Sequence, residues 1–148
     1  MEDSDFFYNS GNNKFKEGDF NDAIQNYTKA IELDPNDFEA YNNMGNAKFK
    51  IGNYNGAMHD YNKAIELKPD FTYAYYNRGD VKKITSDYKG AMQDFNKTIE
   101  LDPNYAPAYV RLGLAKYDLS NFLDAKKILI KQLSSILTTT QYFNWLSF

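Results

Sequence analysis

Few residues of this chain have the types and spacing that catalysis requires. His59 is the single histidine, and Asp60 follows it directly. A histidine without a nucleophile partner cannot form a Ser–His–Asp triad, and one histidine in a chain without cysteine makes a poor zinc site. Glu100 and Asp102 lie at the end of a segment that repeats along the chain, which favours a scaffold role over acid–base catalysis. The stretch GNYNGA at 52–57 does not match a phosphate-binding loop. The sequence therefore predicts a protein that is not an enzyme, with no metal ion and no cofactor.

Amide side chains form the pattern that could bind a ligand. Residues three apart share one face of a helix, and two rows at this spacing recur every 34 residues: Asn9, Asn43 and Asn77, and Asn12, Asn46 and Asp80. An amide offers one acceptor and two donors, so such rows could pair with the backbone of an extended peptide. The alternative explanation is compositional, because asparagine is also frequent in expected loops, at Asn36, Asn53 and Asn104.

Asparagine is a mediocre helix former, about 0.5 kcal/mol worse than alanine, so its recurrence in helices needs a reason. Asn42 belongs to neither row, since tyrosine holds its place in the neighbouring repeats. The row residues are expected to be exposed. Replacing Asn43 and Asn77 with alanine is therefore predicted to change stability little, while peptide binding falls by roughly 1 kcal/mol or more per lost hydrogen bond.

The composition is that of an ordinary soluble domain. The chain has 148 residues, 43% of them hydrophobic and 25% charged, with a net charge of −3 and no cysteine. Without a dense block of lysine and arginine, nucleic acid is not an expected partner. The acidic start, MEDSDFFYNS, does not resemble a secretory signal, and no stretch has the roughly 18 apolar residues of a membrane span. We therefore expect a cytoplasmic protein, with the nucleus as the alternative, and no membrane partner.

An internal repeat must position these amides. AIELDPN at 30–36 returns as AIELKPD at 64–70 and TIELDPN at 98–104. The same step relates one set of glycines, one of alanines and two of aromatic residues: Gly11, Gly45, Gly79 and Gly113; Ala23, Ala57, Ala91 and Ala125; Phe7, Tyr41, Tyr75 and Tyr109; Phe20, Tyr54, Tyr88 and Phe122. Each unit reads as two helices with an apolar face at helical spacing, joined by a turn. Small residues let the two helices approach closely, and stacking the hairpins buries the faces that one hairpin leaves open.

This pattern resembles the tetratricopeptide repeat family. The resemblance implies an all-α protein, a right-handed superhelix (α-solenoid) of antiparallel helix hairpins, with about eight helices and an apolar C-terminal tail or cap. It also implies that the first helix of each unit lines a concave groove, where a partner protein binds as an extended peptide. We expect a single domain over 1–148, with units at 4–37, 38–71, 72–105 and 106–139 and a tail at 140–148.

The fourth unit departs from the pattern. Gln132 replaces the alanine or threonine of the other second helices, and Leu137 replaces their proline. We expect helix to run past residue 133, as a cap or as the start of a further helix. The stretch TTTQYFNWLSF at 138–148 carries no charge, so it is expected to pack against this protein, a second copy or a partner.

The resemblance places the candidate peptide-binding residues on the first helices. Members of the family that bind extended peptides use an asparagine ladder, and Asn9, Asn43 and Asn77 match its place. The aromatic candidates fit core packing as well as exposure in the groove. The full set of candidates is Asn9, Asn12, Asn43, Asn46, Asn77, Asp80, Arg111, Tyr8, Tyr73, Tyr76, Phe15, Phe49, Lys16 and Lys50.

A co-chaperone domain is the first alternative function. Small domains of this family hold the acidic C-terminal tails of heat-shock chaperones in a clamp of lysine, asparagine and arginine. Asn12 and Asn43 match the two asparagines of that clamp, but Tyr8, Tyr73 and Asn77 stand where its cations belong. A carboxylate that loses water needs compensating charge, so this function would require an altered clamp.

The sequence also allows a shifted position of the clamp and a second alternative function. Shifting the clamp by one unit recovers Arg111 and still lacks both lysines, so nearby cations such as Lys16 and Lys50 would have to compensate. The second alternative is a structural or self-associating module, whose apolar tail packs on a neighbour and whose groove is incidental.

Overall fold

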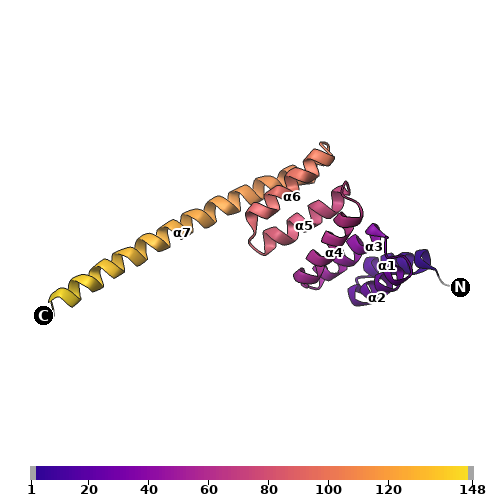
Figure 1. Ribbon diagram of the computed structural model, residues 1–148, viewed down its shortest axis with the longest axis horizontal. Coiled ribbons are helices and arrows are strands. Elements are labelled where there is room, and N and C mark those ends of the chain that lie inside the picture. The colour runs from indigo at the N-terminus through magenta and orange to yellow at the C-terminus, as the bar shows by residue number, and fades with distance from the viewer. Residues whose placement is uncertain (1–2, 147–148) are drawn as a thin grey trace.

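The computed structural model is all-helical over the residues it describes, which are the backbone of 3–146 and the side chains up to Ile130 except Ala125 and Leu129. Six helices form three antiparallel hairpins, and a longer seventh helix follows them (Figure 1). The hairpins stack in chain order, and the two termini lie at opposite ends of the molecule (Figure 1). The predicted all-α solenoid of helix hairpins is therefore confirmed.

Each hairpin coincides with one of the first three predicted units. The first helices are α1 (Ser4–Glu17), α3 (Phe38–Lys50) and α5 (Thr72–Ile84). The second helices are α2 (Phe20–Leu33), α4 (Tyr54–Leu67) and α6 (Tyr88–Leu101). Side-chain caps fix the starts of α1, α3, α4 and α6. In α4, for example, the Asn53 amide oxygen accepts from the Gly56 N–H at 2.9 Å.

The turn inside each hairpin needs one residue with positive φ. Gly18 (φ 87°) and Gly52 (φ 78°) supply it in the first two hairpins, as expected for glycine at a helix end. The third hairpin uses Ser86 (φ 66°). There the hydroxyl of the preceding Thr85 donates to the Val81 carbonyl at 3.0 Å.

A glycine packed against a ring forms the centre of each hairpin. A Cβ added at Gly45 would lie 2.7 Å from the Tyr61 ring, and one added at Gly79 would lie 2.7 Å from the Phe95 ring. Gly11 meets Tyr27 in the same way. Burying a side chain of this size contributes about 1.5–3 kcal/mol, so the repeated glycine and ring together account for much of the stability of a hairpin.

The fourth hairpin does not form within the described residues. The segment expected to make its two helices is one continuous helix, α7 (Ala106–Leu146, 41 residues), which runs away from the hairpins (Figure 1). The helix count is therefore seven where about eight were expected, and the helix does run past residue 133. The first part of α7 caps the third hairpin, because fully buried Ala115 packs with Phe95.

Two local features explain why α7 stays continuous. No glycine or proline follows Gly113, so the strongest helix-ending residues are missing. Leu129 stands at the place of the buried Phe95, so the ring that packs against the repeated glycine has no counterpart. As a result, a Cβ added at Gly113 would meet no atom within 4 Å. The division into four units and a single domain stays a prediction.

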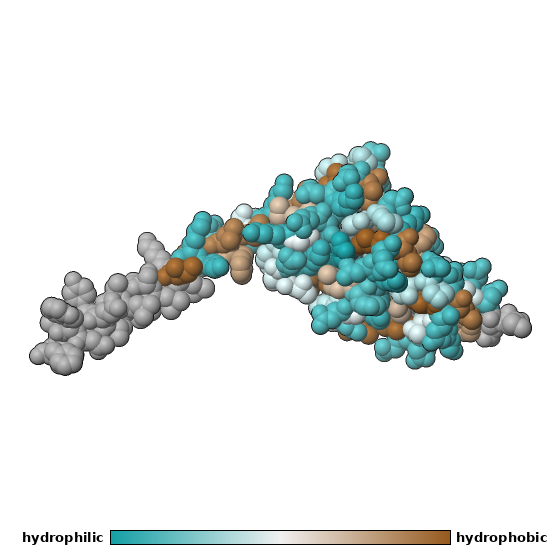
Figure 2. Space-filling model, viewed as in Figure 1, coloured by the Kyte–Doolittle hydropathy of each residue, from teal (hydrophilic) through white to brown (hydrophobic). Residues whose placement is uncertain are grey.

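Several apolar side chains of α7 are exposed to solvent. Val110 (63%), Tyr117 (65%) and Ile128 (58%) are among the most exposed large apolar residues, and Figure 2 shows apolar patches where α7 leaves the hairpins. Even so, the described part of the chain contains no helix that is both long and apolar enough to cross a bilayer. The side chains of the tail, 140–148, lie outside the described residues, and so does their expected packing.

Candidate peptide-binding groove

The first helices are tied together by one contact that recurs at each junction between hairpins. The Asn43 amide nitrogen donates to the Tyr8 hydroxyl at 3.1 Å and to the Asn12 amide oxygen at 3.2 Å, which joins α3 to α1. The Asn77 amide nitrogen donates to the Asn42 amide oxygen at 3.0 Å, which joins α5 to α3. Arg111 repeats the contact from α7, donating to the Tyr76 hydroxyl at 3.3 Å.

The row of Asn9, Asn43 and Asn77 therefore has a structural role that sequence reasoning missed. Asn43 and Asn77 are half-buried and bridge neighbouring hairpins, so replacing them will cost stability, contrary to the prediction of little change. Asn9, on the first described helix, is exposed. The signal for the structural role was the 34-residue recurrence itself, which suits a repeated junction as well as a repeated ligand contact.

The second row, Asn12 and Asn46, supports the rings inside the hairpins. The Tyr27 hydroxyl donates to the Asn12 amide oxygen and the Tyr61 hydroxyl to the Asn46 amide oxygen, both at 2.8 Å. Burial raises the pKa of both tyrosines above their usual range, so the hydroxyls stay protonated and donate. These bonds fix the amide oxygens. The amide nitrogen of Asn46 has no hydrogen-bond partner among the described side chains, so it is free to donate into the groove.

The third hairpin uses a different pair at the same places. Phe95 stands at the place of the tyrosine and has no hydroxyl to donate. Asp80 stands at the place of the asparagine that accepts this hydrogen bond in the first two hairpins. Asp80 instead forms an ion pair with Arg111 at 3.0 Å. Burial raises the pKa of Asp80, and the Arg111 charge opposes that shift. The ring and its partner thus change together, which sequence comparison of the three units alone could have shown.

Asn42 is the most buried of the three asparagines in the stretch 41–46, with 5% exposure. Its amide nitrogen donates to the Asn43 amide oxygen at 3.2 Å, while its own oxygen accepts from Asn77. It therefore links the two rungs of the row, although its type does not recur at 34-residue steps. No periodic signal could have identified it.

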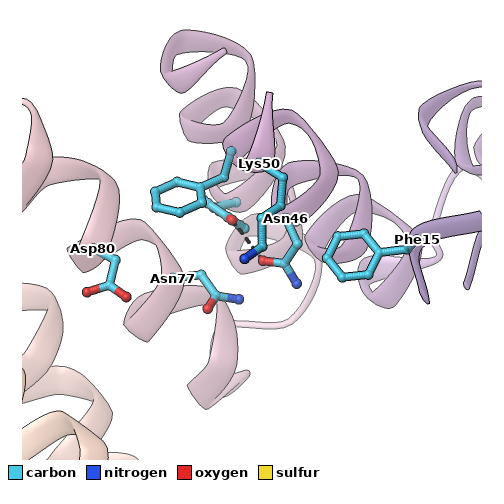
Figure 3. Close-up of a pocket in the computed structure, with 7 residues that line it drawn as sticks. Phe15, Asn46, Lys50, Asn77 and Asp80 are labelled. Atoms are coloured by element: carbon cyan, nitrogen blue, oxygen red, sulfur yellow. Dashed lines mark hydrogen bonds between the residues drawn. The ribbon is translucent and has the colours of Figure 1, made fainter. Parts of the chain in front are cut away.

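Three hollows follow these amides along the first helices. The first, of about 190 Å³, is lined by residues that include Asn12, Phe15 and Lys16. The second, of about 210 Å³, is lined by Phe49, Lys50, Asp80 and others, and Figure 3 shows how Asn46, Asn77 and Lys50 surround it. The third, of about 400 Å³, is lined by residues that include Tyr8, Asn43, Tyr73 and Asn77.

The aromatic candidates divide between packing and exposure. Phe15 and Phe49 are half-buried, pack on the aromatic residue that opens the next helix, and still line hollows. Tyr73 is 53% exposed. Tyr76 lies 5.9 Å from the Phe95 ring and 5.2 Å from the Tyr105 ring, and it lines none of the three hollows, so its role is packing.

Known sequence families match the repeated part of the chain. A TPR repeat family matches residues 11–52 and 45–83, and a tetratricopeptide repeat family matches residues 72–105. The chain belongs to the tetratricopeptide repeat (TPR) family. No curated protein sequence matches the chain closely enough to add a relative.

Solved TPR structures share the fold. The first TPR of Spaghetti (RPAP3) bound to the HSP90 peptide SRMEEVD is 29% identical, with a TM-score of 0.78 over 79% of this chain and 93% of that chain. The second TPR domain of human RPAP3, in complex with the HSP70 peptide SGPTIEEVD, is 31% identical, with a TM-score of 0.72 over 74% and 92%. MamA is 29% identical, with a TM-score of 0.77 over 80% and 70%.

The clamp residues of the co-chaperone alternative lie together in this TPR domain. Tyr8, Asn12 and Asn43 are in direct contact, and Tyr73 and Asn77 line the same hollow as Tyr8. The Tyr8 hydroxyl also donates to the Glu39 carboxylate at 3.3 Å. A carboxylate therefore stands at the place where a chaperone tail would need positive charge. Burial raises the pKa of Tyr8, and the nearby Glu39 charge adds to that shift.

The surroundings of His59 contain no catalytic triad or metal site among the described residues. His59 is exposed, and its ring nitrogen lies 3.2 Å from the Asp60 carboxylate, which also pairs with Lys48 at 2.7 Å. Within the described residues, no group of three histidine or acidic side chains could hold a metal ion.

Proposed function

We propose that this TPR domain is a protein-interaction scaffold that binds an extended peptide segment of a partner along the first helices. The observation that supports this function is the row of three open hollows beside the amides of Asn12, Asn46 and Asn77. The free amide donor of Asn46 can pair with a peptide carbonyl, and the half-buried rings of Phe15 and Phe49 can contact side chains. The proposed activity is binding without catalysis, in the cytoplasm or, alternatively, the nucleus.

Selection of random twelve-residue peptides against the folded domain tests this function. The groove variant is Lys50→Ala with Tyr73→Ala, since both side chains are exposed and line hollows. The control variant is Glu32→Ala with His59→Ala, on exposed sites of the second helices. Selected peptides should bind the groove variant about tenfold more weakly, as expected when two contacts of about 0.7 kcal/mol each are lost, and the control variant should bind unchanged. Failure to select any peptide, or equal binding by both variants, would reject the groove.

Binding of acidic chaperone tails is the second candidate function. It is favoured by the solved TPR structures that hold SRMEEVD and SGPTIEEVD and by the match of Asn12 and Asn43. It is opposed by tyrosine at position 8 and by Glu39 beside it. Fluorescence anisotropy with these two peptides separates the candidates: micromolar binding that Lys50→Ala and Arg111→Ala both abolish would favour the chaperone tail.

Self-association is the third candidate, because α7 exposes Val110, Tyr117, Phe122 and Ile128 to water. Sedimentation of the full chain over a range of concentrations tests it directly. A chain that stays monomeric at high concentration excludes this function, and dimers that disappear when residues 134–148 are removed would assign it to the tail.

A further inference from the structure

The largest of the three hollows differs from the other two in charge. Glu39 is its one charged lining residue, whereas Lys16 lines one of the smaller hollows and Lys50, together with Asp80, lines the other. Glu39 is exposed, and no cation forms an ion pair with it among the described residues. Lys68, the lysine that lies over the neighbouring Phe38 ring at 4.5 Å, does not line the hollow.

Unused acceptors lie beside the Glu39 carboxylate in this hollow, together with the amide nitrogen of Asn46. The Tyr8 hydroxyl already donates to Glu39, and the amide nitrogens of Asn43 and Asn77 already donate to neighbouring hairpins. The second carboxylate oxygen of Glu39 and the amide oxygen of Asn77 accept no hydrogen bond from any described group. The charge of Glu39 and these free acceptors can therefore hold a cationic ligand that donates N–H groups.

Aromatic surface completes the lining. The rings of Phe71 and Tyr73 lie 5.7 Å apart at 71°, and Tyr73 is 53% exposed. Exposed rings of this kind attract cations over their faces and cover the methylene stem of a long basic side chain. Carboxylate, free acceptors and rings thus favour the same ligand.

We propose that the hollow lined by Tyr8, Glu39, Phe71, Tyr73 and Asn77 binds a lysine or arginine side chain of the partner segment. The stem lies over the rings, and the charged head pairs with Glu39 and donates to the Asn77 amide oxygen. This proposal names the partner class for the groove proposed above, and it selects basic segments over acidic C-terminal tails.

The first test does not depend on any selected peptide. Chemical-shift titration of the ¹⁵N-labelled full chain uses Nα-acetyl-lysine N-methylamide, with the norleucine and glutamate analogues as matched probes. The lysine probe should shift the Glu39 and Tyr73 amides, and norleucine, which has the same stem without the charge, should shift them about three- to fivefold less, the range of a surface charge pair. An equal response to norleucine, a larger response to glutamate, or no response at these amides overturns the proposal.

The second test separates this site from the groove itself. Glu39→Gln keeps the size and polarity of the side chain and removes its charge, and Glu32→Gln on the exposed face of α2 is the control. Lysine-containing peptides from the selection should bind Glu39→Gln about three- to fivefold more weakly, and the effect should vanish when norleucine replaces the lysine. If peptides bind the groove but ignore Glu39→Gln, the basic-side-chain site is wrong and the groove stands. If no peptide binds, the groove is rejected, and the first test alone decides the site.

Discussion

Residues 72–101 and residues 106–135 carry the same repeat pattern, but only the first segment closes into a hairpin. In the closed hairpin, Gly79 packs against the Phe95 ring. In α7, the equivalent Gly113 meets no atom within 4 Å. The second helix shows the clearest difference in sequence, because Leu129 stands at the place of the Phe95 ring. A glycine at the right spacing therefore does not close a hairpin by itself, and in all three closed hairpins it packs against an aromatic ring.

Distances between spin labels should show the difference most strongly. The chain has no cysteine, so Thr72→Cys with Lys97→Cys and Ala106→Cys with Lys131→Cys give two pairs at equivalent places. Packed antiparallel helices lie about 8–10 Å apart, so the first pair should lie within about 20 Å. The second pair, along one helix with about 1.5 Å rise per residue, should lie about 37 Å apart. Pulsed electron resonance measures both, and equal short distances would mean that the fourth hairpin closes in solution.

Alanine at the two glycines should change stability in opposite directions. Gly79→Ala places a Cβ against the Phe95 ring and should destabilise the domain by about 1–3 kcal/mol through overpacking, less the gain in helix propensity. Gly113→Ala meets nothing and should stabilise α7 by up to about 1 kcal/mol. Urea denaturation of both variants measures the difference. A loss of stability in Gly113→Ala would indicate that a helix covers this face of α7.

The junctions between hairpins should be weaker than the hairpins. Asn43→Ala with Asn77→Ala removes the bonds that join α1, α3 and α5 and leaves the Asn42 amide oxygen without its donor. The loss should be about 0.5–1.5 kcal/mol per hydrogen bond. Thermal denaturation measures it, with Asn9→Ala as the exposed control. Unchanged stability would return these asparagines to the purely ligand-binding role predicted from the sequence.

The smallest effect should come from a single ring hydroxyl. Tyr61→Phe reproduces the ring of the third hairpin inside the second and removes the bond to the Asn46 amide oxygen. The cost should be about 1 kcal/mol, measured by urea denaturation. Combining it with Asn46→Leu removes both polar partners, and should cost little more than Tyr61→Phe alone if the two groups serve mainly each other.

The sequence was most informative where the pattern is periodic. The first three hairpins, the positive-φ glycines of the first two turns and the glycine–ring contacts all follow from residues at 34-residue steps. The fourth unit keeps the repeated glycine and Phe122, but it has Leu129 in place of the buried ring, and the segment forms one continuous helix. The structural role of Asn42 could not be predicted, because asparagine does not recur at its place in the other units. Its hydrogen bonds to Asn43 and Asn77 depend on where it lies in the fold. The place of Glu39 in its unit predicts that it lies on the groove side. That no lysine or arginine forms an ion pair with it among the described residues can be seen only in the structure.

The contacts at the hairpin junctions also bear on how this protein responds to force. The buried ring of each hairpin packs on its own glycine and also contacts the next helix, and the hydrogen bonds of Asn43, Asn77 and Arg111 add half-buried ties between neighbouring hairpins. Under tension along the superhelix, we expect the junctions to open before the hairpins, so the domain should stretch as a soft spring. A peptide lying across α1, α3 and α5 would bridge two junctions and make that spring stiffer. Extension measured under load, with and without a selected peptide, would then report occupancy of the groove as a change in compliance.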